Sequence, residues 1–181
     1  MQAALDLIGE SGLGAFTQPR VAQRLGLRQS HVTYYFPTRD DLLAAVADEA
    51  VRQRVATLRE AQATAPGPRE QVAALARVLA SPERTRVLMA LTQSADHNEA
   101  VRAAFGTLSA GLAPLSASLL RDVGAEVDES SLALLQATST GIAVLALARG
   151  GDVTVLAERL LTELLDHLAA ATPARTGTGP T

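Results

Sequence analysis

The 181-residue sequence contains no cysteine. Disulfide bonds, thiolate nucleophiles and cysteine-based zinc sites are therefore excluded. Histidine is also scarce, and His31, His97 and His167 fall in separate predicted elements. No nucleophile–base pair or paired-acid arrangement is indicated, so we expect neither an enzyme nor a bound cofactor.

Aromatic side chains are nearly absent as well. They make up only 3% of the sequence, whereas hydrophobic residues make up 48%. The core must then be built from Ala, Leu and Val, which favours packed helices over a sheet. A chain of this length can bury a substantial core and form one or two domains.

Long uninterrupted apolar runs are also missing. The most apolar segment, residues 132–148, is broken by polar residues and is shorter than the roughly 20 residues that a membrane span needs. No basic leader precedes an apolar core, so we expect no signal peptide. The prediction is a cytoplasmic protein without a membrane partner.

Helical spacing dominates the sequence from end to end, with breaks at proline and glycine. The predicted fold is all-α with about nine helices, in which a head of three helices is attached to a larger helical body. We expect the head at residues 1–45, the body at 46–171 and a disordered tail at 172–181, because the tail has nothing apolar to bury. Pro114 lies inside the helix predicted at 100–123, where a kink or a split is expected.

Two short helices between Thr17 and Tyr35 are the most informative feature. Thr17 can cap the first, and Gly26 ends it because glycine enters the left-handed conformation without penalty. The second covers about residues 28–35 and stops before Pro37. Short helices joined by a glycine-containing turn are typical of the helix-turn-helix unit, whose second helix enters the DNA major groove.

Positive charge is concentrated in this same segment. Between residues 17 and 36 the sequence has Arg20, Arg24 and Arg28 and no acidic residue, although the whole chain has a net charge of −3. Local positive charge on an acidic protein is the pattern expected of phosphate contacts. We therefore predict double-stranded DNA as a partner.

Three motifs follow one another at fixed spacing, namely Gly26-Leu27, Tyr34-Tyr35-Phe36 and Thr38-Arg39-Asp40-Asp41-Leu42-Leu43. Over about residues 3–47 they resemble the N-terminal signature of TetR-type transcriptional repressors. The resemblance implies a homodimeric repressor that a small, mainly apolar effector releases from a palindromic operator. Two alternatives stay open: a helical protein-interaction module without DNA binding, and an enzyme.

Within the second short helix, Gln29 is the strongest candidate to read a base. It lies in the first turn, and its amide can pair bidentately with an adenine edge. His31 is either a contact or a solvated residue, and Tyr35 either a contact or a packing residue. The resemblance implies that the start of the first short helix contacts the DNA backbone and that Arg39 binds a DNA phosphate. The predicted DNA-binding residues are Thr17, Gln18, Arg20, Arg28, Gln29, Ser30, His31, Thr33, Tyr34, Tyr35 and Arg39.

The last two predicted helices carry apolar stripes. In the family that the head resembles, the corresponding helices form the dimer interface, and the alternative is packing within one subunit. The predicted interface residues are Leu134, Ala137, Gly141, Val144, Leu145, Ala148, Leu160 and Leu164.

The resemblance also implies an effector pocket inside the body. Its predicted lining is mainly apolar, and each residue could equally be plain core. These residues are Leu88, Met89, Thr92, Phe105, Leu108 and Leu112. Asp96-His97-Asn98-Glu99 is the one cluster that resembles metal ligands, but consecutive residues on a turn rarely converge on one ion, so we expect no metal site.

Overall fold

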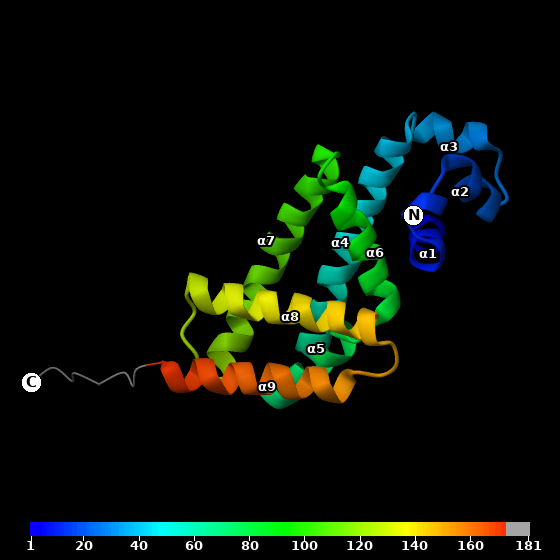
Figure 1. Ribbon diagram of the computed structural model, residues 1–181. Helices are drawn as coiled ribbons and strands as arrows, with labels where there is room; N and C mark the ends of the chain where they lie inside the picture. The colour runs from blue at the N-terminus through cyan, green and yellow to red at the C-terminus, as the bar shows by residue number, and fades with distance from the viewer. Residues whose placement is uncertain (173–181) are drawn as a thin grey trace, which may run out of the picture.

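The structure, a computed structural model, describes residues 1–172, which form nine α-helices, one 3₁₀ helix and no strand (Figure 1). The helices are α1 (Gln2–Ser11), the 3₁₀ helix η1 (Leu13–Ala15), α2 (Gln18–Arg24), α3 (Gln29–Tyr35), α4 (Arg39–Thr64), α5 (Pro68–Leu79), α6 (Pro82–Ser94), α7 (Glu99–Asp122), α8 (Glu129–Arg149) and α9 (Thr154–Ala171). The all-α prediction with about nine helices is confirmed. The disorder predicted for the tail falls, from residue 173 onward, outside the described residues.

Local side chains fix where the helices of the head begin and end. The Thr17 hydroxyl accepts a hydrogen bond from the backbone N–H of Arg20 (3.4 Å), and Gly26 adopts a φ of 66° after α2. At α4, the Thr38 hydroxyl accepts from the Asp41 N–H (3.0 Å), and the Asp41 carboxylate accepts from the Thr38 N–H (2.9 Å). This reciprocal capping pair sets the start of α4, and its hydrogen bonds lower the pKa of Asp41.

Helices α1–α3 form a head at one end of the molecule, and α4 runs without interruption from the head into the body (Figure 1). Inside the body, α7 packs along α4, while α8 and α9 lie side by side at the end away from the head. The domain boundary predicted at residues 45 and 46 therefore falls inside a continuous helix. A tilt of α4 would move the head as a unit.

The buried residues form two cores, one in the head and one in the distal body. The head core extends beyond residue 45, because Leu91 of α6 and Val101 and Ala104 of α7 complete it. The distal core joins α5, the end of α7, α8 and α9. Because closely packed interiors transmit displacement, the head can respond to movement of α6 and α7 as well as α4.

Of the two alternatives predicted at Pro114, a kink or a split, the split does not occur, since α7 continues through this residue to Asp122. Proline removes the hydrogen bond to the carbonyl four residues earlier, which belongs to Ala110. Both residues are exposed, so water can satisfy that carbonyl. Thr172, the first residue of the predicted tail, contacts the body: its hydroxyl accepts a hydrogen bond from the Glu126 N–H (2.8 Å).

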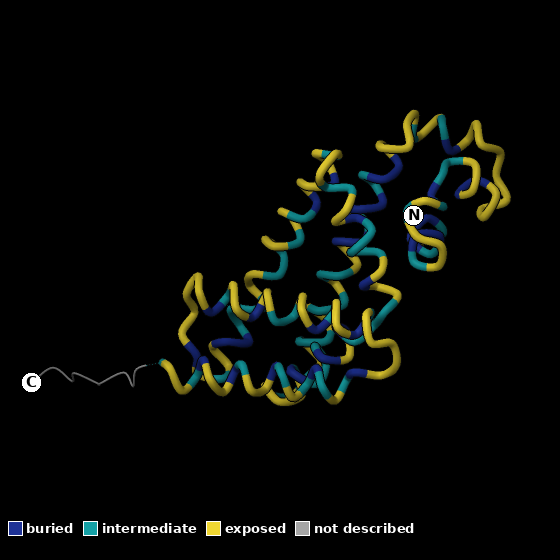
Figure 2. The backbone as a smooth tube through the Cα atoms, viewed as in Figure 1, coloured by how far each residue is buried: buried dark blue, intermediate teal, exposed yellow. Residues whose placement is uncertain are grey.

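Helices α7 and α8 are long and apolar enough to cross a membrane, by length and composition alone. Both nevertheless pack against other helices of the body, α7 on α4 and α8 on α9. Much of their length is exposed on the single chain (Figure 2), including Leu134, Val144 and Leu145 of α8. The apolar face of α8 is therefore uncovered within one subunit.

Candidate functional site

Helix α3 lies at the outer edge of the head, and most of its residues are exposed (Figures 1 and 2). Val32 is buried and anchors the helix, whereas Gln29, Ser30 and His31 are exposed. Tyr34 and Tyr35 are 80% and 73% exposed, and their rings meet edge to face at 5.1 Å. Tyr35 is thus a surface residue, which favours the contact interpretation over packing.

Two polar residues of the helix-turn-helix are already engaged within the head. The Thr33 hydroxyl donates to the carbonyl of Gln29 (2.7 Å), one turn earlier in α3. The Gln18 amide donates to the carbonyl of Phe36 and so ties the start of α2 to the end of α3. Both residues were predicted to touch DNA, and both also hold the local geometry.

The arginines of the head divide into paired and unpaired groups. Arg24 forms a bidentate ion pair with Glu10 of α1, which lowers the pKa of that carboxyl. Arg20 and Arg28 form no ion pair within the described part of the chain and are exposed. The free positive charge beside α3 therefore comes from these two side chains, because the charge of Arg24 is neutralised.

Arg39 has structural contacts that the sequence did not reveal. Its Nε donates to the carbonyl of Phe16 (3.0 Å) and its Nη2 to the carbonyl of Leu13 (3.2 Å). The guanidinium carbon also lies 5.7 Å from the centre of the Phe16 ring. Arg39 thus joins the η1 turn to the start of α4, and a phosphate contact would use the donors that remain.

We expect Arg39→Ala to lower the stability of the head by about 1–2 kcal/mol, because two charge-assisted hydrogen bonds to backbone carbonyls are lost. Thermal unfolding followed by circular dichroism measures the effect. Arg28→Ala is the matched control, since this exposed arginine has no side-chain hydrogen bond among residues 1–172. Equal melting temperatures for the two variants would show that Arg39 has no such structural role.

A cavity of about 380 Å³ lies in the body, between α4, α5, α6, α7 and α8. The structure brings all six predicted pocket residues to it: Leu88, Met89, Thr92, Phe105, Leu108 and Leu112. Sequence reasoning missed several polar lining residues, among them Arg54, Gln62 and Gln71. No acidic side chain occurs in the lining among the described residues.

Helix α6 lies between this cavity and the head. Leu88 and Met89 line the cavity, while Val87 of the same helix faces α1. The approach is close, since a Cβ added at Gly9 of α1 would lie 3.5 Å from a Val87 methyl group. Helices α4 and α7 also approach closely, because a Cβ added at Gly111 of α7 would lie 2.9 Å from a Val55 methyl group of α4, which would then have to shift.

The predicted interface residues of α8 share one exposed face, whereas Leu160 and Leu164 of the adjoining α9 are half-buried. The exposed set is Leu134, Ala137, Gly141, Val144, Leu145 and Ala148, which we call the α8 stripe. The single chain leaves the α8 stripe uncovered. Its role in dimerisation remains a prediction.

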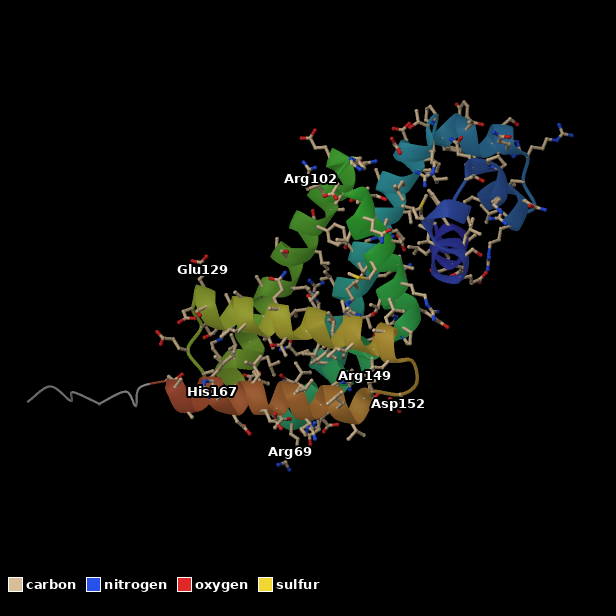
Figure 3. The ribbon with its side chains drawn as sticks, viewed as in Figure 1. Arg69, Arg102, Glu129, Arg149, Asp152 and His167 are labelled. Carbon is tan, nitrogen blue, oxygen red and sulfur yellow. The ribbon has the colours of Figure 1, made fainter. Side chains whose placement is uncertain are left out.

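The Asp96–Glu99 turn has a structural explanation. Asn98 caps α7, because its side-chain oxygen accepts from the Val101 N–H (3.1 Å). Arg102, at the start of α7 (Figure 3), donates to the carbonyl of Ala95 (2.8 Å) and so covers the end of α6. No group of three metal-ligating side chains converges anywhere in residues 1–172. His167 lies near the end of α9 that is far from the head (Figure 3).

Comparisons with known proteins agree with this geometry. Residues 1–46 match the family model described as bacterial regulatory proteins, tetR family. A comparison of the whole sequence with curated proteins gives no significant match.

Solved structures share the fold over nearly the full length. A transcriptional regulator from Rhodococcus sp. Rha1 superimposes with a TM-score of 0.78 at 22% identity, covering 93% of each chain. A TetR transcription regulator from Haloarcula marismortui gives 0.77 at 20% identity, covering 92% of this chain and 94% of the other. A regulator from Saccharomonospora viridis in complex with choline gives 0.77 at 18% identity, covering 92% and 93%.

Proposed function

We propose that this chain, whose N-terminal head is a helix-turn-helix domain of the tetR family, is a cytoplasmic, homodimeric repressor of transcription that a small ligand releases from its DNA operator. The observation that carries the proposal is the exposed face of α3. Gln29, Ser30 and His31 stand free in its first turn, and the unpaired Arg20 and Arg28 lie beside it. Side chains at this position of a recognition helix reach base edges, and neighbouring arginines neutralise phosphates.

A dimer follows from the size of the recognition element. One helix of seven residues covers too few base pairs for specific binding, so two heads must act together. The α8 stripe supplies an uncovered apolar face on which a second copy can pack. We expect the two recognition helices about 34–36 Å apart, so that they meet successive major grooves of a palindromic operator.

Release from DNA requires the cavity to be coupled to the head. Helix α4 connects them through the chain, and α6 connects them through packing, with the cavity on one side and α1 on the other. A ligand can shift the head only if it binds one arrangement of these helices better than the other. Typical coupling is ~1–3 kcal/mol, which corresponds to a change of about 5–150-fold in operator affinity.

The lining supports a mainly apolar effector. The structural neighbour from Saccharomonospora viridis is in complex with choline, a small cation. The cavity of this chain has no acidic side chain in its described lining and carries Arg54 instead. We therefore do not expect a cationic effector here.

The base-reading role of Gln29 is tested by Gln29→Ala, which should cost about 1–3 kcal/mol at one operator position and relax base preference there. Arg28→Ala is the contrasting variant and should weaken binding to every duplex and reduce the slope of affinity against salt by about one. Fluorescence anisotropy with operator and scrambled duplexes at several salt concentrations separates the two effects. If both variants lose affinity equally for all sequences, Gln29 does not read bases.

A further inference from the structure

Arg54 of α4 lines the body cavity without a charged partner. Its Nη1 donates to the carbonyl of Val78 (3.2 Å), near the end of α5. The side chain takes part in none of the ion pairs found among residues 1–172, and its Nε and Nη2 have no protein hydrogen-bond partner there. Arg54 is half-buried, and its Nε and Nη2 are not buried atoms, so both can donate to an anion that enters the cavity.

The charges around Arg54 do not supply that anion. Arg54 also borders a cleft between α1, α4 and α6, whose lining includes Asp6, Glu10 and Glu83, and none of these three pairs with it. Burial, and after it the positive charge of Arg84, lower the pKa of Arg54 to about 10. The group therefore stays charged at neutral pH.

Gln71 of α5 is a second polar residue in the cavity lining. The Oε1 atom of Gln71 is buried and has no hydrogen-bond partner, while its Nε2 donates to the carboxylate of Asp122 (3.5 Å). Because the Nε2 atom donates to Asp122, the orientation of the amide is set, and the Oε1 atom remains as a hydrogen-bond acceptor. Gln71 and Val78 are seven residues apart in α5, so the acceptor lies about 10 Å along the helix from the Arg54 end.

We propose that the cavity binds an apolar carboxylate whose carboxylate group pairs with Arg54 and whose far end donates a hydrogen bond to Gln71. The inference rests on the proposed function and specifies its effector. A guanidinium fork matches a carboxylate bidentately, and the leucine-rich wall between the two polar groups suits an alkyl or aryl body. Arg54 is the one charged residue of the described lining. We therefore expect carboxylates to bind more tightly than neutral molecules, and neutral molecules more tightly than cations.

Four compounds with a straight ten-carbon chain, which we call decyl compounds, test two features of the ligand separately. These are the charge at one end and the hydrogen-bond donor at the other. Isothermal titration calorimetry with the full-length protein compares decanoate, decan-1-ol, decyltrimethylammonium and ω-hydroxydecanoate. We expect decanoate to bind about 10–100-fold more tightly than decan-1-ol, which is the usual contribution of a hydrogen-bonded charge. Decyltrimethylammonium should bind more weakly than both, and ω-hydroxydecanoate more tightly than decanoate.

Matched variants assign the effects to residues. Arg54→Met keeps the apolar stem and should abolish the preference for decanoate over decan-1-ol, whereas Arg54→Lys should keep part of it. Arg59→Met is the control, because Arg59 lies on the same helix, is exposed and lies outside the cavity lining. Gln71→Leu should remove the advantage of ω-hydroxydecanoate over decanoate. Circular dichroism confirms that each variant is folded.

Equal binding of decanoate and decan-1-ol, a preference for the cation, or no binding of any decyl compound overturns the proposal. So does an Arg54→Met protein that folds and still prefers decanoate. Duplex-DNA binding by the same preparations separates this inference from the proposed function. A protein that binds DNA without a carboxylate preference refutes the ligand class alone, and one that binds decanoate through Arg54 but no DNA refutes the regulator alone.

Discussion

Replacing Gly141 with arginine should convert the proposed dimer to a monomer and remove the proposed specific binding to an operator. Gly141 lies in the middle of the α8 stripe, and a Cβ added there meets no atom within 4 Å in the single chain. The arginine therefore fits one subunit but places an unpaired charge in an apolar contact between two. An uncompensated buried charge costs about 3–5 kcal/mol, so we expect the dimer dissociation constant to rise by at least about 100-fold.

Gly106→Arg is the matched control for that substitution. Gly106 is also a helical, exposed glycine with nothing within 4 Å of an added Cβ, and it lies on α7 outside the α8 stripe. Sedimentation velocity at micromolar concentration should show a monomer for Gly141→Arg and a dimer for Gly106→Arg. A Gly141→Arg protein that stays dimeric would place the interface elsewhere.

Phe16→Ala should unfold the head while leaving the body folded and dimeric. Phe16 is completely buried in the head core and lies under the Arg39 guanidinium. Removing a buried phenyl ring costs about 3–5 kcal/mol, a large share of the stability of a small domain. The distal core shares no buried residue with the head core, so α8 and α9 should keep their packing.

Hydrogen exchange, fluorescence anisotropy with duplex DNA and sedimentation measure three consequences of Phe16→Ala. We expect loss of protection in α1–α3, loss of duplex binding and an unchanged oligomeric state. Tyr35→Ala serves as the control, because its exposed ring can be removed without leaving a cavity. If Phe16→Ala melts the entire chain in one step, the two cores act as one cooperative unit, contrary to our account.

Local signals were sufficient to predict where the first short helix of the head begins and ends. Thr17 caps α2, and Gly26 follows its end with a positive φ. These signals act over one turn and can be read directly from the chain. Of the kink or split predicted at Pro114, the split does not occur, because the carbonyl that loses its hydrogen bond is exposed to water, and exposure depends on tertiary packing.

The candidate site, like the fold, was predictable from the sequence only in part. Periodicity and motif spacing identified α3, and the family resemblance led to the apolar cavity residues. The second roles of Gln18 and Arg39 were not visible, because their carbonyl partners at Phe36, Phe16 and Leu13 come near only after folding. Arg54 gave no sequence signal either, since a single arginine in a long helix is ordinarily solvated.

Selection of bound sequences from a pool of random DNA duplexes tests the central claim most directly. The account predicts enrichment of an inverted repeat whose half-site centres are about 10 base pairs apart. At this spacing the two recognition helices enter successive major grooves. Enrichment of no sequence, or of a motif without two-fold symmetry, would contradict it.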